Sequence, residues 1–190
     1  MNSPTSIQTF TGIFFDPFNP RVEDVRIEDI AHALTMQCRF GGHVRKRWSV
    51  AQHSLMVSDL CPEHLKLEGL LHDASEAYLT DLPRPIKHHP LLSSYRGLEA
   101  DLEYAISKRF DLSWPMPDEI KAADNAVLVA EAIALKNGIE GWQEHQKAWG
   151  TQLDQPVDPT LVQAIRNANP PTDDYIKEEF LRAFHALGGE

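Results

Sequence analysis

The sequence has few cysteines, no excess of positive charge and no long apolar run. Its two cysteines, Cys38 and Cys61, are too few for a disulfide framework and lack metal-type pairing. The 28 acidic residues outnumber the 18 lysines and arginines, which gives a formal net charge of −10 and excludes the broad basic surface that binds duplex nucleic acid. No stretch approaches the roughly 18 apolar residues of a membrane span, and no signal-peptide pattern opens the chain. We therefore expect a cytoplasmic protein that binds neither a membrane nor a nucleic-acid duplex.

What is present is the composition of an ordinary globular protein. Hydrophobic residues make up 42% of the chain and charged residues 24%, which excludes disorder as the main state. A length of 190 residues suits one domain. We expect a single domain over residues 1–190, with its core at about 22–137 and a C-terminal cap and helix at 138–190.

Strand signals occur only near the start of the chain. Residues 7–10 alternate apolar and polar side chains, Thr11 and Gly12 are typical of a turn, and a second short apolar run follows at 13–15. This pattern favours a small β-hairpin.

Apolar residues at helical spacing follow along the rest of the chain. They predict helices at about 23–37, from a Ser49 cap to about 60, from 62 to about 81, around 95–106, at about 117–137 and from about 173 onwards. Residues 139–157 show no clean period and are expected to form a loop or an irregular cap. The expected fold class is all-α, a helical bundle with a small N-terminal β-hairpin.

Three ionisable residues gather in one short stretch, at His72, Asp73 and Glu76. On an α-helix, Glu76 lies about 40° from His72 and about 60° from Asp73, so the three share one face. Ionisable groups that converge beside a buried apolar stripe need a partner, and a divalent cation is the usual one.

Two further residues give the same signal from other predicted helices. His53 lies on the apolar stripe of the helix before this stretch, and Asp124 lies on the apolar face of a later one. Alone, a histidine is more often structural, and Asp124 could simply pair with Lys121. Together, two imidazoles and two carboxylates suit one divalent transition metal with open positions for water and substrate. Co, Mn, Zn, Fe and Ni all fit this set.

The order His, His-Asp, Asp resembles the HD-domain phosphohydrolase superfamily. Longer stretches resemble its small bacterial and prophage-encoded 5'-deoxynucleotidase-like branch, at residues 27–34, 38–43, 49–54 and 71–78. The resemblance covers about residues 7–135 and implies an HD-domain helical bundle. It also implies four metal ligands, His53, His72, Asp73 and Asp124.

The resemblance implies roles for other residues as well. Glu76 matches the acidic residue that works with the metal-bound water, and with Asp73 it forms the expected catalytic centre. Asp81 matches a residue that touches the sugar of the nucleotide. Arg39 matches a phosphate-contacting arginine, and Phe40 stands where an aromatic residue, often Trp, shapes the pocket. A Gly-Tyr-Pro triplet after the HD pair is missing, which speaks against a two-metal phosphodiesterase.

The expected activity is metal-dependent hydrolysis of a deoxynucleoside 5'-monophosphate to nucleoside and phosphate. Lys87 and Lys121 could give the site a positive mouth, which favours an alternative, a phage-type deoxynucleoside triphosphate triphosphohydrolase. A second alternative is a non-catalytic nucleotide-binding HD protein, although all ligand positions and Glu76 are filled. The expected partner is a nucleotide, and the resemblance implies a homo-oligomer, a dimer or larger.

Overall fold

The computed structural model describes residues 4–136, 158–169 and 171–190. This part of the chain is mostly helical, and a two-stranded antiparallel hairpin lies near its start. Strand β1 (Ile7–Gln8) pairs with β2 (Phe14–Phe15). The predicted all-α class with an N-terminal hairpin is confirmed at this level.

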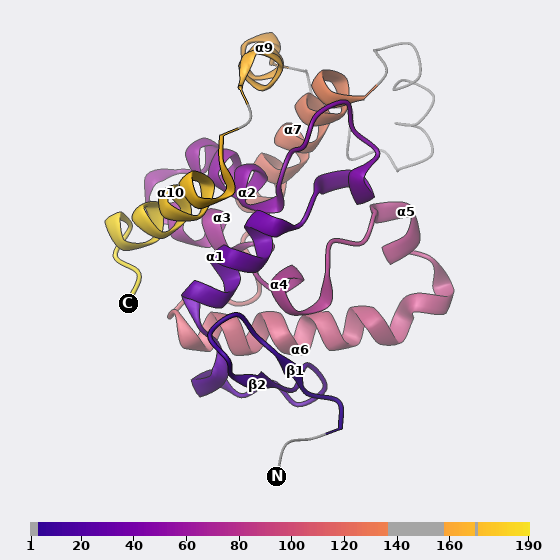
Figure 1. Ribbon diagram of the computed structural model, residues 1–190, viewed down its shortest axis with the longest axis vertical. Coiled ribbons are helices and arrows are strands. Elements are labelled where there is room, and N and C mark those ends of the chain that lie inside the picture. The colour runs from indigo at the N-terminus through magenta and orange to yellow at the C-terminus, as the bar shows by residue number, and fades with distance from the viewer. Residues whose placement is uncertain (1–3, 137–157, 170) are drawn as a thin grey trace.

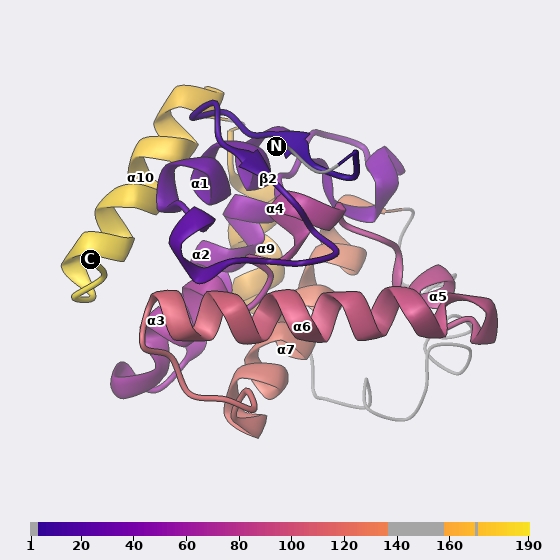
Figure 2. The same cartoon turned by 90° about the horizontal axis from the view of Figure 1, so that it is seen from below.

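Two long helices and several shorter ones enclose the buried core. They are α1 (Ile27–Met36), α2 (Val50–Leu60), α3 (Lys66–Leu71), α4 (Glu76–Leu79), α5 (Arg84–Lys87), α6 (Ser93–Arg109), α7 (Asp118–Leu135), α9 (Pro159–Asn167) and α10 (Asp173–Ala186), with 3-10 turns η1 (Val22–Asp24), η2 (Arg39–Gly42), η3 (Glu63–Leu65) and η4 (Pro90–Leu92). Helix α6 runs along one side of the molecule (Figure 2). Among the described helices, none is both long and apolar enough to span a membrane.

The hairpin is tied to the start of α1 by two hydrogen bonds. The backbone N–H and the hydroxyl of Thr11, in the hairpin turn, donate to the carboxylate of Asp29 at 2.6 and 2.9 Å. Phe15 is fully buried in the core beside α1. The hairpin thus contributes to the core.

Helix α2 begins where the sequence predicts. The Ser49 hydroxyl accepts from the Gln52 N–H at 3.2 Å, and the Gln52 side chain accepts from the Ser49 N–H at 3.0 Å, which completes a capping box. This cap fixes the first turn of α2, and His53 follows directly on its buried side.

The predicted helix from 62 to 81 is wrong as a single helix. It is divided into η3, α3 and α4, and backbone bonds of the i→i−3 type run through the break, including Ala74 N–H to Leu71 O and Glu76 N–H to Asp73 O. Three-residue winding places side chains at i and i+3 above one another. Asp73 and Glu76 therefore align more closely than on an α-helix.

Other boundaries differ as well. The predicted helix at 23–37 is η1 followed by α1, because Arg26 is extended. Helix α9 was not predicted; Asp158 caps it by accepting from the Thr160 N–H, and Pro159 occupies its first turn. Helix α7 ends at Leu135, and the loop expected at 139–157 lies outside the described residues.

The core extends beyond the predicted 22–137. Ile176, Phe180 and Phe184 of α10 are buried in the same cluster as Ile30 and Leu34 of α1, and Figure 1 shows α10 beside α1, α2 and α3. Helix α10 is therefore a core element.

Candidate metal centre and the adjoining cavity

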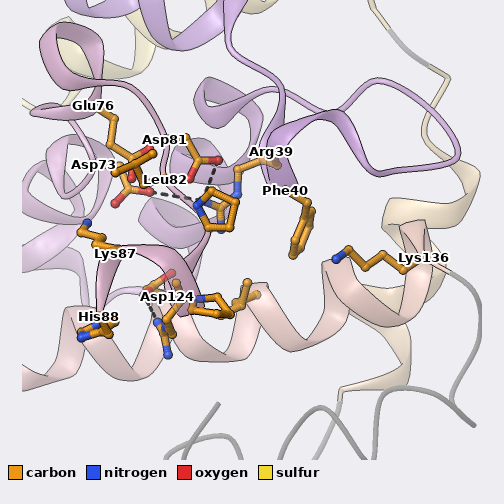
Figure 3. A pocket seen from close by; sticks show the side chains of 14 residues that line it. Arg39, Phe40, Asp73, Glu76, Asp81, Leu82, Lys87, His88, Asp124 and Lys136 are labelled. Carbon is orange, nitrogen blue, oxygen red and sulfur yellow. Dashed lines mark hydrogen bonds and ion pairs between the residues drawn. The ribbon is translucent and has the colours of Figure 1, made fainter. Parts of the chain in front are cut away.

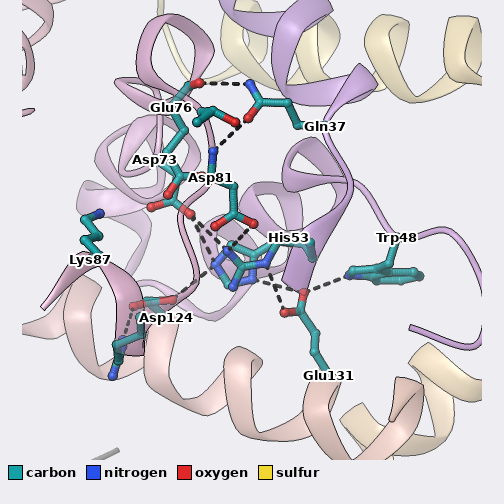
Figure 4. Close-up of polar contacts among 12 residues, drawn as sticks. Gln37, Trp48, His53, Asp73, Glu76, Asp81, Lys87, Asp124 and Glu131 are labelled. Atoms are coloured by element: carbon teal, nitrogen blue, oxygen red, sulfur yellow. Dashed lines mark hydrogen bonds and ion pairs between the residues drawn. The ribbon is translucent and has the colours of Figure 1, made fainter. Parts of the chain in front are cut away.

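Four side chains from three parts of the chain meet in the middle of the molecule. His53 comes from α2, His72 and Asp73 from the turn after α3, and Asp124 from α7. Ligand atoms of the first three all lie within 4.8 Å of one another. The Asp124 Oδ1 lies 3.2 Å from the His53 Nε2 and 4.0 Å from the His72 Nε2. The structure thus brings together all four predicted ligands, of which Figure 4 labels His53, Asp73 and Asp124.

Both imidazoles are held by the nitrogen that faces away from the cluster. The His72 Nδ1 lies 2.8 Å from the carbonyl oxygen of Gly69, and the His53 Nδ1 lies 3.0 Å from a carboxylate oxygen of Glu131. Because a carbonyl only accepts, the His72 Nδ1 donates this hydrogen bond, and its Nε2 is the nitrogen that faces the cluster. Neither Nε2 makes a hydrogen bond to the protein, although both are buried. This is how metal-ligating histidines are usually oriented.

The charges around the cluster also suit a cation. Burial acts against ionisation, but His72, His53 and Arg39 hold the pKa of Asp73 well below its usual value. Burial and Arg39 lower the pKa of His53, yet Glu131 and Asp124 outweigh them and raise it to about 9. The carboxylates therefore stabilise positive charge at the centre of the cluster, and this donor set fits a divalent transition metal.

Glu131 is the main site residue that the sequence reasoning missed. It is fully buried on α7 and accepts from the Trp48 Nε1 at 2.7 Å as well as from His53. Its other oxygen lies 3.4 Å from the Arg39 Nε. Glu131 follows Asp124 by seven residues, so it lies on the same helical face. The signal that singled out Asp124, a carboxylate on an apolar face, was present here too.

A cavity of about 200 Å³ adjoins the cluster (Figure 3). Its lining comes mainly from η2, the turn around Asp73, the segment after α4 and α7: Arg39, Phe40, Asp73, Glu76, Asp81, Leu82, Pro83, Arg84, Pro85, Lys87, His88, Asp124, Leu128 and Lys136. Of the seven residues predicted at the catalytic centre or in contact with substrate, only Lys121 is missing from this lining.

Two carboxylates lining the cavity each have one oxygen without a hydrogen-bond partner. These buried atoms are the Glu76 Oε2 and the Asp81 Oδ2. Burial raises the pKa of Glu76 well above its usual value, and the charges of Asp73 and Asp81 raise it further. Burial also raises the pKa of Asp81. Burial and the neighbouring carboxylates thus favour the protonated, uncharged form of Glu76 more than in an ordinary glutamate.

Arg39 and Phe40 lie in a tight turn at the edge of the cavity. The buried Arg39 guanidinium lies 3.7 Å from Asp73 and 3.8 Å from Asp81, between their carboxylates. Phe40 has a φ of 58°, which bulky residues rarely adopt outside functional sites. Gly41 continues this left-handed turn at 60°, and the Lys136 Nζ lies 4.7 Å from the centre of the Phe40 ring.

The two predicted lysines differ in position. Lys87 lines the cavity, but its ammonium group is bonded to Glu99. Lys121 is exposed on α7 and does not line the cavity. The Asp124 carboxylate lies 3.4 Å from the guanidinium group of Arg84. Arg84 lies between two prolines and is not among the predicted site residues.

Comparison with known proteins places the chain among bacterial relatives. No family model matches it. It is 39% identical to YfdR, an uncharacterized protein of Escherichia coli K12, over 66% of this chain and 69% of the relative. It is 33% identical to RCAP_rcc00048, an uncharacterized protein of Rhodobacter capsulatus, over 93% of this chain and 92% of the relative. The chain belongs to the same family as these two proteins.

The names of these family members state no activity, so the chemistry has to be read from the site. Four lining side chains are formally cationic and four are carboxylates, namely Arg39, Arg84, Lys87 and Lys136 against Asp73, Glu76, Asp81 and Asp124. Their formal charges cancel. A divalent cation at the cluster would leave the cavity with two positive charges, which favours a small dianionic ligand.

Proposed function

We propose that the protein is an HD-domain, metal-dependent nucleotide phosphohydrolase that converts a deoxynucleoside 5'-monophosphate to nucleoside and phosphate. One observation carries this proposal. The Nε2 atoms of His53 and His72 are buried, make no hydrogen bond, and face the carboxylates of Asp124 and Asp73. The sequence resemblance and the charge balance of the adjoining cavity support the substrate class.

His53, His72, Asp73 and Asp124 would hold one divalent transition ion, from among Mn, Fe, Co, Ni and Zn. Such an ion, when bound, lowers the pKa of a water and offsets the charge of a phosphate group. Glu131 and the Gly69 carbonyl keep both imidazoles oriented towards the ion.

Glu76 is the acid–base residue of the proposed reaction. It takes a proton from the attacking water as the new P–O bond forms, and returns a proton to the 5'-oxygen as the old P–O bond breaks. Its raised pKa, caused first by burial, favours the half of the reaction in which Glu76 holds the proton and returns it to the leaving oxygen.

Arg39 and Asp81 hold the two parts of the nucleotide. The fork of donors on Arg39 binds phosphate oxygens, which a lysine matches less well. The Asp81 Oδ2, which makes no hydrogen bond within the protein and lies 3.8 Å from the Arg39 guanidinium, accepts from the 3'-hydroxyl of the sugar, and this contact disfavours sugars that have no donor there.

The cavity favours the monophosphate over the triphosphate. Lys87 is already bonded to Glu99, and Lys121 does not line the cavity, so the residues expected to bind a longer phosphate chain are not assembled. A phosphate monoester carries about two negative charges near pH 7, which matches the two positive charges of the ion-loaded cavity.

Product analysis tests the proposal directly. The purified protein is stripped with a chelator, reloaded with each of the five metals in turn, and incubated with nucleoside mono-, di- and triphosphates. Orthophosphate and nucleoside from deoxynucleoside monophosphates are expected. Release of triphosphate would establish the triphosphohydrolase alternative, nucleotide binding without turnover would establish the non-catalytic one, and failure to bind any metal would overturn the proposal.

A further inference from the structure

A glutamine just after α1 connects two residues that line the cavity. The Gln37 Nε2 donates to the backbone carbonyl of Glu76 at 2.8 Å, and its Oε1 accepts from the backbone N–H of Asp81 at 2.8 Å (Figure 4). Both ends of one amide therefore make well-formed hydrogen bonds to the main chain. A glutamine amide that bridges two backbone segments fixes the distance between them.

The two bridged residues each have a side-chain oxygen without a hydrogen bond, and the one on Asp81 lies 3.8 Å from the Arg39 guanidinium. Both the Glu76 Oε2 and the Asp81 Oδ2 are buried acceptors that make no hydrogen bond within the protein. Buried acceptors of this kind are costly unless a ligand donor satisfies them. Gln37 thus holds the backbone of both ligand-facing carboxylates through these two hydrogen bonds.

The backbone just before Asp81 needs such a hold. Thr80 has a φ of 81° and a ψ of 149°, a conformation that is unfavourable for a β-branched residue. Its N–H donates to the Glu76 carbonyl at 2.8 Å, and its own carbonyl accepts from the Tyr95 hydroxyl at 3.1 Å. Surrounding hydrogen bonds therefore keep Asp81 turned into the cavity.

We propose that Gln37 is a positioning residue that sets the sugar selectivity of the enzyme. It keeps the Asp81 carboxylate at a fixed offset from Glu76, so that a nucleotide whose phosphate reacts beside Glu76 places its 3'-hydroxyl at Asp81. This inference rests on the proposed function. The metal ligands are oriented separately, by Glu131 and the Gly69 carbonyl, and the Glu76 backbone keeps its hydrogen bonds to Asp73 and Thr80. Loss of the Gln37 bridge therefore affects recognition of the sugar more than reaction at the phosphate.

The test compares a 2'-deoxynucleoside 5'-monophosphate with its 2',3'-dideoxy analogue, which has no hydroxyl for Asp81. The wild-type protein is expected to prefer the first in kcat/KM. Gln37→Met, which keeps the length and removes both hydrogen bonds, should lower this preference about tenfold, the effect of one well-placed hydrogen bond. Its turnover of the dideoxy analogue should change less than about threefold.

Two further variants separate positioning from a general loss of structure. Gln37→Glu keeps an acceptor for the Asp81 N–H, so it should retain more of the preference than Gln37→Met. If Gln37→Met does not fold, Gln37→Glu takes its place as the test variant. Gln163→Met, at an exposed glutamine of α9, is the matched control and should keep the wild-type ratio. Equal losses on both nucleotides in Gln37→Met, or an unchanged ratio, would overturn the proposal.

Amide hydrogen exchange at Asp81 tests the hydrogen bond from the Asp81 N–H to Gln37 without an activity measurement. Gln37→Met should speed exchange of this amide at least tenfold, since its acceptor is gone, and Gln163→Met should not. Unchanged exchange would overturn the role of Gln37 alone. A wild-type protein that hydrolyses neither nucleotide would overturn the proposed function, and the selectivity claim with it.

Discussion

The metal-ligand cluster and the cationic residues of the same cavity differ in which of their atoms the rest of the protein contacts. In the cluster, contacts within the protein use the outer nitrogens of His53 and His72 and leave the inner nitrogens without a hydrogen bond. Among the cations, contacts within the protein involve the charged groups themselves: Lys87 is bonded to Glu99, and Arg39 is paired with Glu131.

The metal cluster is therefore a preformed site, whereas an anion at the cationic residues has to share them with carboxylates of the protein. A metal entering the cluster would replace the close contacts of the two Nε2 atoms with Asp124 and Asp73. It would leave the outer hydrogen bonds of the imidazoles in place, so their orientation is fixed before binding. A phosphate that reaches Arg39 has to share it with Asp73, Asp81 and Glu131. Binding of the metal should therefore depend on single residues, and binding of the anion should depend on a network.

Removal of one oxygen ligand is expected to give the largest effect. Asp73→Ala should abolish stoichiometric metal binding and nucleotide hydrolysis together, because a donor atom and a charge are lost at once. Elemental analysis and circular dichroism of the purified variant measure metal content and helix content. Asp101→Ala, at an exposed position of α6, is the control. Stoichiometric metal with normal turnover in Asp73→Ala would remove Asp73 from the site.

Glu76→Gln should separate chemistry from binding. The amide cannot transfer the proton, so kcat should fall by about 10²–10⁴ while metal content stays unchanged. Steady-state kinetics and elemental analysis on the same preparation provide both values, and Glu28→Gln, at an exposed glutamate of α1, is the control. A wild-type kcat would mean that another group moves the proton.

Glu131→Gln tests whether the outer hydrogen bond matters to the cluster. The amide loses the charge that orients the His53 imidazole, so the metal Kd should rise about 10–100-fold. Titration against a competing chelator measures this Kd. Glu119→Gln, at an exposed position of the same helix, should leave it unchanged. An unaltered Kd in Glu131→Gln would show that packing alone orients His53.

The smallest effect concerns stability and contrasts the two lysines. Lys87→Ala leaves the buried Glu99 carboxylate without its partner, so the free energy of unfolding should fall by about 1–3 kcal/mol. Lys121→Ala, at an exposed position, should change it by less than about 0.5 kcal/mol. Urea denaturation measures both. Equal changes would mean that the bond between Lys87 and Glu99 contributes nothing.

Patterns of side chains on helix faces could be predicted, and irregular backbone could not. His53, Asp124 and the Ser49 cap follow from apolar spacing and local hydrogen bonding, and the structure places all three as expected. The break between α3 and α4 escaped prediction because Leu70 and Ala74 continue the apolar period through it. That the assembled residues bind a metal or a nucleotide stays a prediction.

Side-chain contacts between residues far apart in the sequence could not be predicted either. Glu131 and Asp124 share one face of α7, but only the folded chain shows that the Trp48 Nε1 donates a hydrogen bond to Glu131. Arg84 lies between two prolines in the sequence, which indicates a loop and gives no direction for its side chain. The short helix α5 is what turns this guanidinium towards Asp124.

The place of α10 in the core has a consequence for biosynthesis. Phe180 and Phe184 are fully buried against residues as early as Phe15, so the core closes only after more than 180 residues have left the ribosome. Until then the apolar surfaces of Ile30 and Leu34 lack the cover that α10 provides. A nascent chain of this protein therefore passes through an aggregation-prone stage late in translation, in which a chaperone that shields apolar segments would find its binding sites.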